Sequence, residues 1–149
     1  MKISTKKGDY LFTDIKNKRV RKNDKIIEAL GLVDETIISI IEADSCVDIP
    51  YVEEIVNTLS AIAGYVSGYQ EAFDISVLLT KIEKDIENCP SNFKFNYPYK
   101  QKEKIALSTA RVKVRALERA LVAINDTEVF YLPFINRLSD FMYYLQVTI

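Results

Sequence analysis

The sequence predicts an all-α protein, an up-and-down bundle of five helices. Glycine and proline number only four each in 149 residues, which is too few for a turn-rich all-β fold. Apolar residues recur every three or four positions along five segments, which is the period of amphipathic helices. A chain of this length fits a single domain, residues 1–149, that needs no disulfide or metal to fold.

The first two helices are marked by residues that favour helix starts. The first is expected to begin after Asn23 or Asp24, either of which can cap it, and to run to about residue 43. Asp48 and Pro50 resemble the cap and the first-turn proline of a second helix, which continues to about residue 66. The glycines at its end, four residues apart, are typical of a close helix crossing: Gly64 and Gly68.

The other three helices are bounded by breaks in the pattern. The third is expected over about 73–88, because the proline at position 90 disfavours a helical residue before it. The fourth and fifth are expected over about 101–124 and 129–146. Between the third and fourth, residues 90–100 carry four aromatic side chains, so we expect this loop to pack on the bundle or to line a pocket.

The charges are distributed unevenly along the chain. Residues 1–25 hold nine Lys or Arg and three Asp, a net charge of +6, whereas the remainder holds eleven Lys or Arg and eighteen Asp or Glu, a net charge of −7. A basic N-terminal arm of about residues 1–22 on an acidic body indicates an anionic ligand nearby, such as nucleic acid or phosphates. A merely solvated tail is the alternative.

The composition excludes several kinds of site. The chain has no histidine, which rules out a Ser-His-Asp triad, a Cys-His dyad and a histidine zinc site. Cys46 and Cys89 match no metal-ligand spacing, so we expect reduced thiols in the cytoplasm and no metal site. The N-terminus is too polar for a signal peptide, and no apolar run approaches the ~18 residues of a membrane span.

Polar side chains form patterns on the last two helices. One line, spaced by four, three, four and three residues, lies along the fourth helix: Lys104, Ser108, Arg111, Arg115 and Glu118. It is either a solvated face with an Arg115–Glu118 pair, or a phosphate site with a row of cations. A polar run at 136–140 interrupts the apolar stripe of the fifth helix, and indicates either a buried hydrogen-bond network or a ligand contact.

Taken in order, four stretches resemble the PduO-type ATP:cob(I)alamin adenosyltransferases. Residues 5–9, TKKGD, resemble the family's T-[KR]-T-G-D motif. Residues 20–24 and 28–35 resemble VSKDD and EAYGTVDE. Residues 95–98 and 110–119 resemble F-x-L-P-G-G and the arginine-rich helix that contains R-R-A-E-R. Residues 132–140, LPFINRLSD, are very close to LPYLNRLSD and are the most specific match.

The resemblance implies a homotrimer of five-helix bundles with active sites between subunits. Members transfer the 5′-deoxyadenosyl group of ATP to the cobalt of cob(I)alamin and release triphosphate. Cobalt is the nucleophile, so the protein positions the substrates and stabilises charge, which a chain without histidine can do. Magnesium is expected to accompany ATP, although no carboxylate cluster in the sequence marks a dedicated metal site.

The resemblance also implies roles for individual residues. The positions expected to contact the nucleotide are Thr5, Lys6, Gly8 and Asp9 around ATP, Lys22 at the triphosphate, and Arg115, Glu118 and Asn136. Asp34 and Arg111 match a pair that forms an ion pair across subunits beside the corrinoid. Phe95 matches the aromatic residue that covers the lower corrin face and displaces the lower cobalt ligand. The implied catalytic residues are Arg115, Asp34 and Arg111.

The sequence departs from the family pattern mainly at the nucleotide positions. Gly8-Asp9 is followed directly by Tyr10 instead of a Gly- and Thr-rich loop, and Ala116 replaces the second arginine of R-R-A-E-R. Three hypotheses follow: a divergent active enzyme, a relative that binds corrinoid or another ligand without ATP turnover, or a helical module whose basic arm binds nucleic acid. Only Tyr10 and Phe12 interleave with the basic residues of the arm, which argues against nucleic acid.

Overall fold

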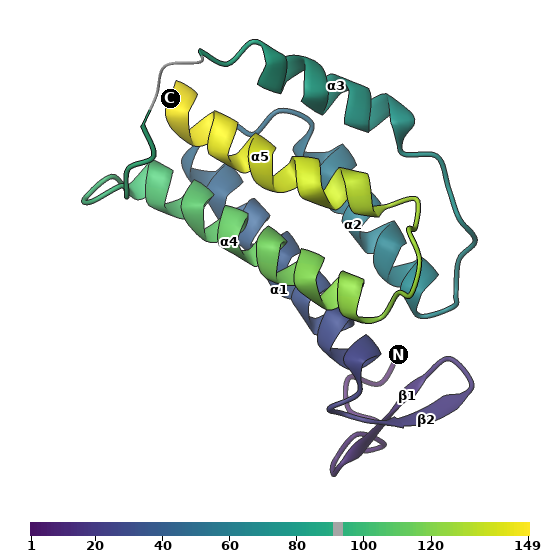
Figure 1. The fold of residues 1–149 in the computed structure, drawn as a ribbon. Helices are drawn as coiled ribbons and strands as arrows, with labels where there is room; N and C mark the ends of the chain where they lie inside the picture. Colours follow the sequence, from purple (N-terminus) through teal and green to yellow (C-terminus); the bar gives the residue numbers. More distant parts are fainter. Residues whose placement is uncertain (91–93) are drawn as a thin grey trace.

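The computed structural model describes residues 1–90 and 94–149, which fold into a helical bundle with a small N-terminal hairpin (Figure 1). The elements are β1 (Phe12–Ile15), β2 (Lys18–Arg21), α1 (Lys25–Cys46), α2 (Val52–Val66), α3 (Ser76–Glu87), α4 (Lys102–Ala123) and α5 (Leu132–Thr148). The five predicted helices are confirmed, and successive helices run in alternate directions (Figure 1). No helix in these two described stretches is both long and apolar enough to cross a membrane.

The centre of the bundle is α4. It packs extensively against both α1 and α5, whereas α2 covers α1 and α3 flanks α5. The side chain of Thr36, near the middle of α1, donates to the carbonyl of Lys113 near the middle of α4 at 3.3 Å. Because these helices are antiparallel, the start of α1 lies near the end of α4, and the hairpin lies beyond that end (Figure 1).

The N-terminal arm contains regular structure that the sequence analysis did not predict. Strands β1 and β2 pair antiparallel, with Phe12 opposite Arg21 and Ile15 opposite Lys18. The turn between them is fastened to the end of α2, where Lys16 Nζ donates to the carbonyl of Gly68 at 2.8 Å. Strands of four residues rich in charge carry too short a pattern to be recognised in the sequence.

Two predicted helix starts are wrong. Helix α2 begins at Val52 after Tyr51, which has a φ of 60°, so Asp48 and Pro50 belong to the preceding turn. Helix α3 begins at Ser76, three residues later than expected, because the carboxylate of Asp74 accepts from the backbone N–H of Ser76 at 2.9 Å. That hydrogen bond lowers the pKa of Asp74.

The prediction of a close helix crossing at the two glycines is also wrong. The three heavy atoms nearest to a Cβ added to Gly64 all belong to the side chain of Gln70, with its Oε1 at 3.0 Å. Gly68 follows α2 at a φ of +86°, a backbone conformation that strains other residues. Gly68 therefore follows the end of the helix and receives the hairpin turn, whereas Gly64 lies inside α2.

Tyr51 ties three helices together next to the start of α2. Its hydroxyl donates to Asp85 of α3 at 3.0 Å, and its ring stacks on Phe141 of α5 with 6.2 Å between centroids. The hydrogen bond to Asp85 is the main reason that the pKa of Tyr51 is raised, and burial adds to it. Together with the ion pairs of Lys81 with Glu54 and of Glu83 with Arg137, this contact holds α3 against α2 and α5.

The Asp24 side chain caps α1, which gives a first testable prediction. Its Oδ1 accepts from the backbone N–H of Ile26 at 2.9 Å, whereas Asn23 instead accepts from the Arg21 side chain. We expect Asp24→Ala to lower the free energy of unfolding by about 1 kcal/mol, measured by urea denaturation. The neighbouring Asn23→Ala is the control, and an equal loss there would contradict Asp24 as the cap.

Candidate functional site

The polar line on α4 faces α5. Ser108 Oγ donates to Gln146 Oε1 of α5 at 2.6 Å. Further along α4, Glu118 Oε2 accepts from Asn136 Nδ2 of α5 at 3.0 Å. Lys113, on the other flank of α4, pairs instead with Glu35 of α1 at 3.3 Å. The line therefore runs along the α4–α5 seam and is not simply a solvated face.

One end of this line meets the aromatic loop. The Arg111 guanidinium lies over the ring of Phe95, 5.5 Å from its centroid. The same ring touches Tyr97 and Tyr143, at centroid distances of 5.2 and 5.6 Å. Phe95 is still 51% exposed, so the cluster presents an apolar surface backed by a cation. The loop prediction is confirmed for residues 94–100, whereas residues 91–93 lie outside the described residues.

Arg111 also holds an unsatisfied donor. Its Nε is buried and has no hydrogen-bond partner among the described residues. A buried N–H without a partner costs about 1–3 kcal/mol. Asp34, the predicted partner, is exposed on α1 and makes no hydrogen bond or ion pair in the described chain. A single chain therefore does not bring Asp34 and Arg111 together.

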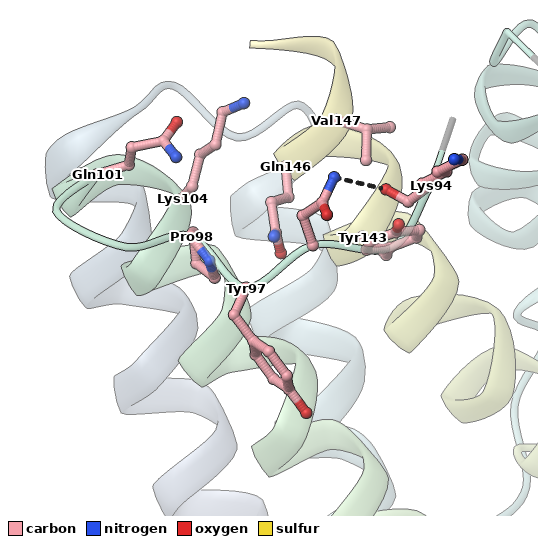
Figure 2. Close-up of a pocket in the computed structure, with 9 residues that line it drawn as sticks. Lys94, Tyr97, Pro98, Gln101, Lys104, Tyr143, Gln146 and Val147 are labelled. Carbon is pink, nitrogen blue, oxygen red and sulfur yellow. Dashed lines mark hydrogen bonds between the residues drawn. The ribbon is translucent and has the colours of Figure 1, made fainter. Parts of the chain in front are cut away.

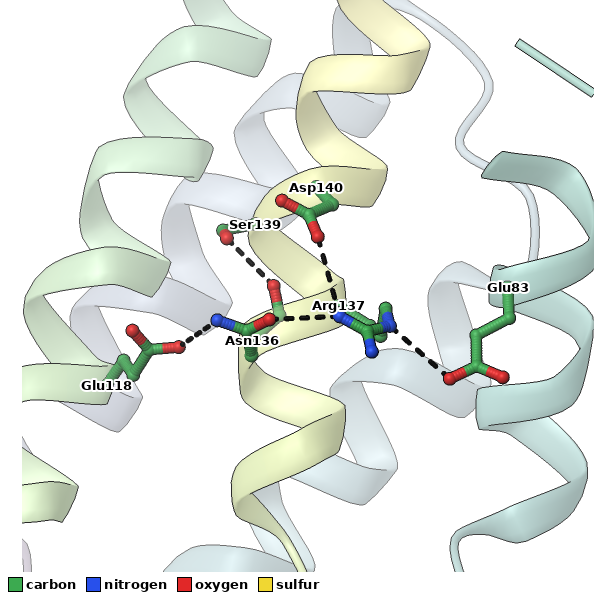
Figure 3. Close-up of polar contacts among 6 residues, drawn as sticks. All are labelled: Glu83, Glu118, Asn136, Arg137, Ser139 and Asp140. Atoms are coloured by element: carbon green, nitrogen blue, oxygen red, sulfur yellow. Dashed lines mark hydrogen bonds and ion pairs between the residues drawn. The ribbon is translucent and has the colours of Figure 1, made fainter. Parts of the chain in front are cut away.

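At its other end, the line on α4 meets the polar run of α5 (Figure 3). Asn136 joins Glu118 to Arg137, whose Nη1 donates to Asn136 Oδ1 at 3.0 Å. Arg137 continues to Glu83 of α3 at 3.3 Å and to Asp140 at 3.7 Å. Glu118, Asn136 and Arg137 also line a pocket of about 420 Å³, together with Glu128 and apolar side chains. Asn136 and Asp140 are exposed, so the interpretation of the run as a buried hydrogen-bond network is wrong, and the ligand contact stays a prediction.

Arg115 lies between the two ends. It is exposed and takes part in no hydrogen bond or ion pair within residues 1–90 and 94–149. The alternative Arg115–Glu118 ion pair is not formed there, since Glu118 is instead bonded to Asn136. An unpaired guanidinium between the aromatic surface and the pocket at Glu118 is available for an anionic ligand.

The N-terminal residues predicted to bind nucleotide stand apart from this seam. Lys22 Nζ donates to the carbonyl of Gly8, so the structure brings these two together. Thr5, Lys6 and Asp9 are exposed, and in the described chain no hydrogen bond or ion pair joins the arm to α4 or α5. The described residues also contain no group of three or more acidic or cysteine side chains that could hold a metal ion.

The sequence analysis missed Gln146 as a site residue. It is only 4% exposed and closes the seam at the aromatic end. It lies four residues after Met142 and seven after Ser139, which is the period of the buried face of α5. A polar residue on that face needs a hydrogen-bond partner, so the sequence could have indicated Gln146 as a site residue.

Two comparisons with known proteins agree on the family. The model of the cobalamin adenosyltransferase family matches residues 3–149. An arginine-to-lysine variant of a PduO-type ATP:co(I)rrinoid adenosyltransferase from Lactobacillus reuteri, solved with ATP, is 27% identical, with 97% of this chain and 92% of that chain covered and a TM-score of 0.82. A phenylalanine-to-histidine variant of a PduO-type enzyme from the same organism, solved with cobalamin and ATP, is 26% identical, with 97% and 89% covered and a TM-score of 0.73. A search of curated proteins found no match. The chain therefore belongs to the cobalamin adenosyltransferase family.

Proposed function

We propose that this protein is an ATP:corrinoid adenosyltransferase, which transfers the 5′-deoxyadenosyl group of ATP to the cobalt of cob(I)alamin and releases triphosphate. The observation that carries the proposal is the seam between α4 and α5. An aromatic surface backed by Arg111 and a pocket at Glu118 lie along one flank of α4. Arg111 and Glu118 are seven residues apart on α4, which is about 10 Å along the helix. That separation suits a macrocycle and a nucleotide whose reacting atoms must meet.

At the corrinoid end, the exposed ring of Phe95 would cover the lower face of the corrin. Arg111 holds that ring from behind, and its buried Nε needs an acceptor that the single chain lacks. Asp34 of a neighbouring subunit would be that acceptor in a homotrimer. A homotrimer would therefore satisfy a donor that is unsatisfied in the single chain.

At the nucleotide end, Arg115 would meet the triphosphate, and Glu118 and Asn136 would hold the nucleoside. Thr5, Lys6, Gly8, Asp9 and Lys22 would close over ATP from the arm. In the reaction a cobalt–carbon bond forms at C5′ while the bond from C5′ to the triphosphate oxygen breaks. Cations that offset charge developing on that oxygen lower the barrier, and no proton transfer is required. Magnesium would arrive with ATP and be held through its phosphates.

A second candidate is a relative that binds corrinoid without turning over ATP. The observation in its favour is the arm, where Gly8 and Asp9 are followed by Tyr10 and Leu11, exposed by 86% and 60%, in place of a phosphate-binding loop. Lys22 is also engaged with the Gly8 carbonyl. Ala116 removes a further cation from the nucleotide side.

An anaerobic assay separates the two candidates. Purified protein is mixed with chemically reduced cobalamin and Mg-ATP, and the absorbance change of adenosylcobalamin formation is followed. Conversion at a catalytic rate is expected. A folded protein that binds cob(II)alamin but forms no adenosylcobalamin would contradict the enzyme and favour the binding protein. We further propose that it acts in the cytoplasm, and sedimentation of the same sample tests for the trimer.

A further inference from the structure

A second pocket, of about 230 Å³, opens between the aromatic loop and the seam of α4 and α5 (Figure 2). Two of its wall residues, Tyr97 and Tyr143, are the ones that contact the Phe95 ring. The pocket is therefore immediately next to the surface proposed for the corrin, on the far side from the nucleotide pocket at Glu118. None of the residues assigned to ATP lines it.

The pocket is electropositive. Lys94 and Lys104 line it, and its lining includes no Asp or Glu. The surrounding segment, residues 94–104, holds four lysines and one glutamate. The positive end of α4 adds to this charge, because Gln101 makes no side-chain cap there. Figure 2 shows Gln101 and Lys104 at this helix start, beside the pocket.

A buried side chain supplies a directed donor at the base of the pocket. Gln146 is 4% exposed and lines the pocket. Its Oε1 is occupied by the Ser108 hydroxyl at 2.6 Å, and no partner for its amide nitrogen is found among the described residues. The NH₂ group is thus held in place with its hydrogens available to a ligand. An amide donor together with two ammonium groups is a donor set for a phosphate or similar oxyanion.

We propose that this pocket binds the phosphodiester of the corrinoid's nucleotide tail. The inference rests on the proposed function, since it concerns how the corrinoid is held. The peripheral amides of cobalamin are neutral, so the phosphodiester is its one anionic group, and it links the lower base to the ring. When Phe95 occupies the lower face, the base must leave the cobalt, and the tail needs a place beside that ring. The Lys94–Lys104 pocket is adjacent to Phe95 and has the complementary charge.

The test compares cobalamin with cobinamide, which lacks both the phosphodiester and the base. We expect Lys94→Ala/Lys104→Ala to raise the KM for cobalamin about three- to tenfold, with kcat unchanged, because two partly solvated charge contacts are lost. The KM for cobinamide should not change. Lys102→Ala, which removes a cation from α4 outside the pocket lining, is the matched control and should alter neither KM. Inorganic phosphate should compete with cobalamin and not with cobinamide.

Each other outcome overturns the inference. An equal rise in KM for both corrinoids would mean that the lysines act on the ring or on the fold. If phosphate binding weakens in the double variant while both KM values are unchanged, the pocket takes a free anion and not the tail. If the wild-type protein turns over neither corrinoid, the proposed enzyme fails, and spectroscopic titration with cob(II)alamin and cob(II)inamide decides the pocket separately. Equal affinities of the wild type for those two ligands would then overturn the pocket assignment.

Discussion

Arg115→Ala is expected to lower kcat for adenosyl transfer by about 10²–10³-fold, because a cation directed at the developing charge of the leaving triphosphate would be lost. Arg115 makes no ion pair within the described residues, so its removal leaves no buried partner behind. The fold should therefore be unaffected, and the affinity for cob(II)alamin should stay within about twofold. The measurements are single-turnover formation of adenosylcobalamin and release of triphosphate.

Lys113→Ala is the matched control for this variant. It also removes a cation from α4, but from the flank that pairs with Glu35 of α1 at 3.3 Å. Half-exposed pairs of this kind contribute at most about 1 kcal/mol to stability, and kcat should be unchanged. If Arg115→Ala retained more than a tenth of wild-type turnover, or if Lys113→Ala lost as much, the assignment of Arg115 to the triphosphate would be wrong.

Phe95→Ala is expected to slow the conversion of cob(II)alamin about 10²-fold when a weak reductant is used, since the lower ligand would no longer be displaced. Cob(I)alamin that has already been reduced chemically has lost that ligand, so its conversion should fall by less than about tenfold. The difference between the two substrates is the signature of the proposed role. Anaerobic spectrophotometry with each oxidation state measures it.

Tyr99→Ala provides the comparison for the aromatic loop. Tyr99 is 81% exposed, and its ring takes part in none of the aromatic contacts of the described residues, so both conversions should proceed as in the wild type. Phe95 itself contacts Arg111, so thermal unfolding of Phe95→Ala must be recorded alongside. An equal loss with both oxidation states would indicate that Phe95 only supports the binding surface and does not act on the lower ligand.

The helices were predictable because their signal is local. In α4, apolar residues at the helical period extend over 101–124, and the observed helix is Lys102–Ala123. The polar line from Lys104 to Glu118 follows from the same period. The predicted starts of α2 and α3 failed because turns at Tyr51 and Asp74 set them, and those turns depend on a positive φ and on one side-chain hydrogen bond. Such features leave little trace in hydrophobic spacing.

What the sequence by itself determined is the number of helices, their amphipathic faces and, through the four matching stretches, the family. Only the tertiary structure decided which side chains meet: Arg111 with Phe95, Ser108 with Gln146, and Glu118 with Asn136. It also placed the hairpin against Gly68 and left the Arg111 Nε without a partner. The physical reason is that periodicity fixes the face that a helix buries, whereas the helix on which that face packs depends on how all the elements fill one core.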